Sequence, residues 1–166
     1  MKSLTAWTLA TACVVTLGAT AFAVEPAKYS RPVAYPAGYR DWTHLKSMVI
    51  QPGHPLHEAF GGIHHIYAND RALRALQRGK PFPDGSVFVF DLLEAKSGDN
   101  AITEGARKVV GVMEKRTKAF ASTGGWGFEG FKGDTQERVV ADPASCAGCH
   151  QAQAQKTDLV FSTYRQ

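Results

Sequence analysis

Cysteine is scarce in this chain, no apolar run has the length of a membrane-spanning helix, and clusters of one charge are missing. Only three cysteines occur in 166 residues, and the pair Cys146 and Cys149 is too closely spaced to be a disulfide framework. Lys and Arg number 19 against 15 Asp and Glu, a formal net charge of +4. Without a basic stripe we expect no nucleic-acid partner.

Apolar residues at 44% and charged residues at 20% exclude collagen, coiled coil and general disorder, and the length fits one domain.

The N-terminus is organised as an export signal. Residues 1–3 are a short basic start, residues 4–17 are apolar and uncharged, and Ala-Phe-Ala at 21–23 forms a small-residue cleavage site. Because a membrane-spanning helix needs roughly 20 apolar residues, we expect a cleaved signal peptide over 1–23 and no stable membrane anchor. Cys13 would leave with that segment. A flexible lead is expected over 24–38, where three prolines occur, and one domain over 39–166.

Periodicity and turn residues predict an α+β fold with an antiparallel sheet of about four or five strands and a few short helices. Asn69 and Gly79 bound one helix as N-cap and stop. Glycine alternates with aromatic residues over 124–131, which marks a strand that another backbone or a flat ligand approaches closely. Strands are expected over 47–50, 62–68, 86–94, 108–114 and 124–131, a helical turn over 39–45, a short helix near 118–122, and polar loops over 97–100 and 132–145.

Cys146-Ala147-Gly148-Cys149-His150 is the strongest chemical pattern in the chain. C-x-x-C-H is the attachment sequence of c-type haem. Two thiols at this spacing add to the two vinyl groups at one edge of the porphyrin, and the adjacent histidine then lies under the iron. We therefore expect one covalently bound haem c, held by Cys146 and Cys149, with His150 as the proximal iron ligand.

Two other chemistries use a C-x-x-C pair. A thioredoxin-like dithiol would need a surrounding βαβ pattern, which is missing here. A structural zinc site would need a second pair of ligands. The remaining histidines offer only loosely spaced candidates: His44, His54, His57, His64 and His65.

The sixth iron position decides the class of function. A methionine or histidine there gives a low-spin electron carrier, whereas an open or apolar distal face admits small ligands. The candidates are Met48, Met113 and one of the neighbouring His64 and His65, which point to opposite faces of a strand. All four have ordinary alternative roles in a core or a hydrogen bond.

Several segments together resemble the cytochrome P-460 family, which includes the cytochromes c′-beta. The matching segments are Pro83-Asp84-Gly85, Thr123-Gly124-Gly125-Trp126-Gly127-Phe128, the late C-x-x-C-H, the tail over 159–163 and the early Tyr39-Arg40-Asp41-Trp42. The resemblance implies a β-rich, usually homodimeric, periplasmic protein with a five-coordinate iron. It also implies that some members link a lysine, from the strand after Pro-Asp-Gly, to the porphyrin and oxidise hydroxylamine or react with nitric oxide. The c′-beta members lack the link, cap the distal face with phenylalanines and bind nitric oxide.

This chain departs from the catalytic members at that lysine. None occurs over 86–95; Lys96 has the right strand parity, and Glu94 is a candidate acid–base group. Phe88 and Phe90, with Phe60 as a third candidate, would instead place apolar bulk over the iron.

We therefore expect a periplasmic haem protein that binds nitric oxide or a similar small nitrogen-oxide ligand and exchanges electrons with a periplasmic partner. A hydroxylamine- or nitric-oxide-oxidising enzyme and a low-spin electron carrier stay open as alternatives, so the sequence does not decide whether the protein is an enzyme.

Overall fold

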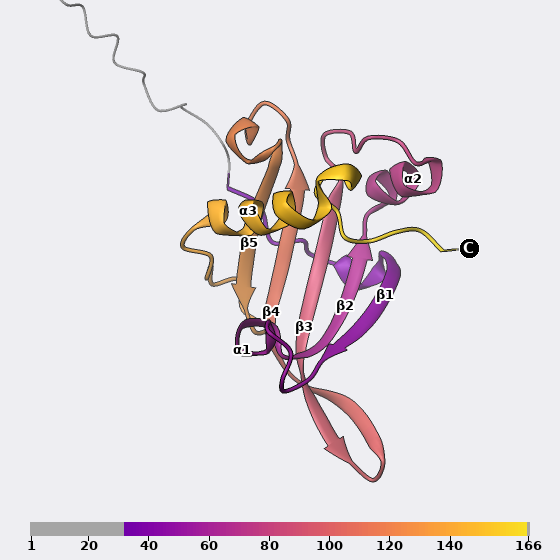
Figure 1. The fold of residues 1–166 in the computed structure, drawn as a ribbon, viewed down its shortest axis with the longest axis vertical. Helices are drawn as coiled ribbons and strands as arrows, with labels where there is room; N and C mark the ends of the chain where they lie inside the picture. The colour runs from indigo at the N-terminus through magenta and orange to yellow at the C-terminus, as the bar shows by residue number, and fades with distance from the viewer. Residues whose placement is uncertain (1–31, 166) are drawn as a thin grey trace, which may run out of the picture.

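The computed structural model describes residues 32–165, so the expected signal peptide and the first part of the lead, 24–31, lie outside the described residues. A single five-stranded antiparallel sheet, in the order β1-β2-β3-β4-β5, confirms the α+β fold with short helices (Figure 1). Its elements are η1 (Tyr39–Asp41), β1 (Thr43–Ile50), α1 (His57–Phe60), β2 (Gly62–Ala68), α2 (Asp70–Arg78), β3 (Val87–Gly98), β4 (Ala101–Lys115), η2 (Ala121–Thr123), β5 (Trp126–Lys132), α3 (Pro143–Ala154) and η3 (Gln155–Thr157). No helix among residues 32–165 is long and apolar enough to cross a membrane.

Three sequence expectations about boundaries were wrong. The helical turn expected over 39–45 ends at Asp41, because β1 begins at Thr43. The loop expected over 97–100 is a tight turn at Asp99 and Asn100, both left-handed (φ 52° and 59°), so β3 and β4 form a ribbon that projects beyond the other strands (Figure 1). The loop expected over 132–145 gives way to α3 at Pro143, whose fixed φ suits the first turn of a helix.

Helix α2 has the ends that the sequence predicts. The Asn69 side chain accepts a hydrogen bond from the Ala72 amide, and Gly79 closes the helix in a left-handed conformation. Both are favourable local choices, since the cap satisfies an orphan amide and glycine meets no steric penalty there.

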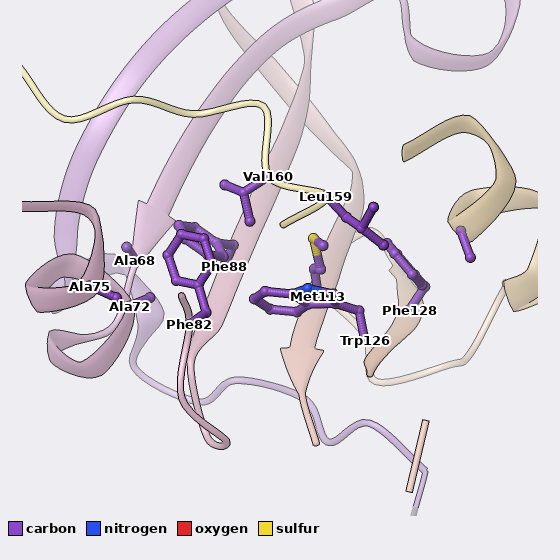
Figure 2. Close-up of a cluster of buried hydrophobic side chains, with 11 residues drawn as sticks. Ala68, Ala72, Ala75, Phe82, Phe88, Met113, Trp126, Phe128, Leu159 and Val160 are labelled. Atoms are coloured by element: carbon purple, nitrogen blue, oxygen red, sulfur yellow. The ribbon is translucent and has the colours of Figure 1, made fainter. Parts of the chain in front are cut away.

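The two faces of the sheet carry separate cores. On the helical face, which we define by Phe88 and Phe90, α2 and α3 cover a cluster that includes Trp126, Met113 and Leu159 (Figure 2). The cluster on the opposite face consists of Val33, Tyr39, Tyr67, Val89, Val110, Val112 and Phe131.

One residue of the expected flexible lead, Val33, belongs to the core of the opposite face. Val33 is buried, and its carbonyl oxygen accepts a 2.7 Å hydrogen bond from Arg138. Pro36 is buried as well, whereas residues 32, 34, 37 and 38 are exposed, so the lead contacts the domain at single positions.

Candidate functional site

The C-x-x-C-H residues lie on helix α3. Asp142 caps this helix by accepting bonds from the Ala144 amide (3.0 Å) and the Ser145 hydroxyl (2.6 Å). Positions 146, 149 and 150 are three and four residues apart, so one side of the helix presents both thiols and the imidazole. Both cysteines are free; Cys149 is exposed and Cys146 is half-buried. Burial raises the pKa of the Cys146 thiol.

The His150 imidazole is oriented in a way that suits metal ligation. Its Nδ1–H donates to the carbonyl oxygen of Leu159 at 2.7 Å. Phe128 and Phe161 flank the ring, with centroid distances of 5.0 and 4.6 Å. Burial lowers the pKa of His150 below its usual value, which favours the neutral ring. The bond to Leu159 leaves the lone pair on Nε2, as in metal-binding histidines whose other nitrogen is held by an outer partner.

The helical face of the sheet also carries an aromatic pair. Phe90 from β3 and Phe60 from the end of α1 meet edge to face, with ring centroids 5.9 Å apart. A Cβ at Gly111 would lie 3.1 Å from the Phe90 ring, so the glycine lets the ring lie close to β4. His64 is fully buried beside the pair: its ring is 4.6 Å from that of Phe90, and its Nε2–H donates to the Phe60 carbonyl oxygen at 2.5 Å.

Several large apolar side chains are exposed, among them two that contact or face the groups just described. Met48 is paired with His64 across β1 and β2, so both lie on the helical face, and Phe161 contacts His150. The exposed fractions are 43% for Met48, 42% for Phe60, 44% for Val139 and 48% for Phe161. Exposed apolar groups of this kind mark a binding surface when they are contiguous. Phe161, at the imidazole of His150, and the two free thiols of the same helix fit one edge of the flat, apolar, iron-containing ring that the C-x-x-C-H motif predicts.

Phe88 and Met113 belong to the core of the helical face. Phe88 is 6% exposed and packs edge to face on Phe82 at 5.3 Å. Met113, its partner on β4, is 7% exposed within the same cluster. The structure therefore brings Phe60 and Phe90 together and places Phe88 beneath the neighbouring helices.

Glu94 and Lys96 lie on the projecting ribbon. Both are exposed, and their side chains lie against Gly105 of β4, where a Cβ would be 2.8 Å from atoms of each. His65 is on the opposite face, where it bonds Ser47 and Glu104, both at 2.7 Å. Among residues 32–165, no group of three or more His, Cys, Asp or Glu side chains could hold a metal ion.

Sequence reasoning missed two features next to His150. The hydrogen-bond partner of its ring is a main-chain carbonyl, which no side-chain pattern reveals. Phe161 lies in the tail over 159–163, which formed part of the family resemblance, but nothing in its spacing indicated contact with the imidazole.

Comparison with known proteins identifies one family. The sequence model described as Cytochrome P460 matches residues 36–162, which include α3 and every strand. No curated protein matches the chain.

Proposed function

Because the chain belongs to the cytochrome P460 family, we propose that it is a c-type haem protein in which one haem is bonded to Cys146 and Cys149 and ligated by His150. The orientation of His150 carries this proposal: the Nδ1 bond to Leu159 leaves Nε2 free for iron. When bound, the haem supplies an iron that accepts a small ligand and changes oxidation state. The chain holds the axial imidazole, orients it and keeps it neutral.

The ligand that we propose is nitric oxide or a similar small nitrogen oxide. Phe60 and Phe90 form an apolar wall on the helical face. Such a wall offers no hydrogen bond to stabilise bound O₂ or a polar substrate. It therefore favours uncharged diatomic ligands, and the protein would act by binding its ligand.

The positions of three other candidate residues support this choice. Lys96 and Glu94, the candidates for oxidation chemistry, are exposed on the ribbon. Met113, a candidate sixth ligand for an electron carrier, is held in the core. Met48 and His64, the other candidates on the helical face, keep the electron carrier as the alternative that the spectra below must distinguish.

We also propose the cellular setting that the resemblance implies: export to the periplasm, a homodimer and a periplasmic redox partner. Light scattering of the purified protein tests the dimer.

Absorption spectra of the exported protein, ferric and ferrous, with and without nitric oxide, test the function. We expect a high-spin spectrum that shifts on adding nitric oxide. Mass spectrometry should find one haem bonded to the chain, and the double variant Cys146→Ala, Cys149→Ala should lose it. A strongly red-shifted ferrous band would indicate a lysine link and favour the enzyme. Sharp low-spin bands that ignore nitric oxide would leave an electron carrier.

A further inference from the structure

We propose that Asp158 is a positioning residue for the axial histidine: with Lys115 and Trp126, it holds the Leu159 carbonyl against Nδ1 of His150. This inference rests on the proposed haem ligation by His150. It concerns how the chain adjusts the electron donation of that ligand.

The chain between α3 and the tail is bent back sharply. Helix α3 ends at Ala154 and η3 at Thr157. Asp158 and Leu159 then follow with left-handed backbones, φ 50° and 65°. Such a conformation is uncommon for residues other than glycine, and for a bulky leucine it is strained. The reversal is what returns the Leu159 carbonyl to His150.

Asp158 anchors this strained bend to the sheet. Its carboxylate accepts two hydrogen bonds from Nζ of Lys115 on β4, at 2.7 and 3.0 Å. It also accepts one from the Trp126 indole on β5, at 3.2 Å, and one from the Phe82 amide, at 3.4 Å. The partners are well buried: Trp126 is 0% exposed and the Lys115 side chain 9%. Strain of this kind persists only where the surroundings enforce it.

Leu159 itself contributes a second anchor. Its side chain is buried in the helical-face core beside Phe128 and Trp126 (Figure 2), and its amide donates to the Ala154 carbonyl oxygen at 2.9 Å. With the side chain and the amide both held, the direction of the Leu159 carbonyl depends on the backbone conformation that Asp158 fixes.

The hydrogen bond from Nδ1 increases the basicity of the imidazole at Nε2. A more basic axial ligand stabilises ferric over ferrous iron, so the reduction potential is lower while the bond is intact. Loosening the Asp158 anchor should weaken the bond and reverse the effect.

The test compares Asp158→Ala and Asp158→Asn in the haem-loaded protein. Asparagine tolerates the left-handed conformation and can still accept from Trp126, but it loses the charge that pairs with Lys115. We expect the midpoint potential to rise and the iron–histidine stretching frequency of the ferrous protein to fall, with a larger shift in the alanine variant. Glu137→Gln is the matched control, since it makes the same carboxyl-to-amide change at the exposed pair with Lys132; it should shift neither quantity.

If Asp158→Ala does not fold, Lys115→Met removes the same ion pair from the β4 side and should shift both quantities in the same direction. Unchanged potential and stretching frequency in the folded variants would overturn this inference alone. A wild-type protein whose ferrous haem is high-spin and yet lacks an iron–histidine band would overturn the proposed ligation and this inference together.

Discussion

Strand β3, which carries Phe90 on the helical face, carries a buried carboxylate, Asp91, on the opposite face. Asp91 is 0% exposed, and its two oxygens accept from Arg107 at 2.7 and 3.4 Å. Arg40 adds a third bond at 3.3 Å, although its own side chain is 46% exposed. The interaction with Asp91 raises the pKa of Arg107 further above its usual range, so the guanidinium stays charged.

Arg107→Met should therefore destabilise the protein strongly. Removing one partner of a buried ion pair typically costs about 3–5 kcal/mol, because the remaining charge is left uncompensated. Arg40 still faces Asp91 after the change, so we expect the lower end, about 3 kcal/mol. In a domain of this size that lowers Tm by roughly 10 °C.

Urea unfolding of the haem-loaded protein, followed by far-ultraviolet circular dichroism, measures this loss. Lys132→Met is the control: it breaks the exposed pair with Glu137, and such pairs contribute about 0–1 kcal/mol. The double variant Asp91→Leu, Arg107→Met should recover much of the stability, since an apolar pair of similar volume is often neutral in place of a buried ion pair. A loss below about 1 kcal/mol in Arg107→Met would refute the reasoning.

Two further predictions concern the aromatic pair and the histidine beside it. Phe90→Ala should speed nitric oxide association, measured by stopped flow, about tenfold, which corresponds to removing about 1.4 kcal/mol of steric barrier. Phe120→Ala, on the opposite face, is the control. An unchanged association rate in Phe90→Ala would remove Phe90 from the distal wall. Burial lowers the pKa of His64 below its usual 6.5, and Lys108 and His65 lower it further. Because the unfolded chain then binds the proton more readily, the free energy of unfolding should fall as pH drops through about 6.5. The urea midpoint should fall less steeply with decreasing pH in His64→Gln than in the wild type. Parallel pH dependences of the two midpoints would contradict this.

The sequence predicted well those elements whose ends are set by neighbouring residues in the chain. The Asn69 cap and Gly79 stop bound α2 as expected, and β2 covers 62–68 as predicted. The C-x-x-C-H motif predicts its chemistry from spacing alone. Strand ends were harder to predict, because the outer part of β3 and β4 is exposed and its strand pairing is a tertiary property.

The candidate site was predictable only where a side chain carries the chemistry. Phe60 and Phe90 could be proposed from the family resemblance, with strand parity added for Phe90, whereas the bond that joins His64 of β2 to the Phe60 carbonyl has no local signal in the sequence. The Leu159 carbonyl and the anchoring of Asp158 link residues distant in the chain, such as Asp158 and Lys115. No local pattern specifies contacts of that range.

The pairing register of β3 decides whether the site can exist. Phe90 faces Phe60 on the helical face, and Asp91 faces Arg107 on the opposite face. A shift by one residue would exchange Phe90 and Asp91 and place a carboxylate on the apolar wall. The turn at 83–85 opposes such a shift: the Gly85 amide donates to the Lys115 carbonyl oxygen at 2.7 Å, and Asp84 accepts from the Thr117 amide and hydroxyl at 2.8 and 2.6 Å. These bonds tie the start of β3 to the end of β4. The Pro-Asp-Gly turn, a weak motif by itself, therefore helps to place Phe90 in the distal wall by fixing the strand register. A substitution of Asp84 should consequently change ligand binding even though Asp84 does not contact the ligand.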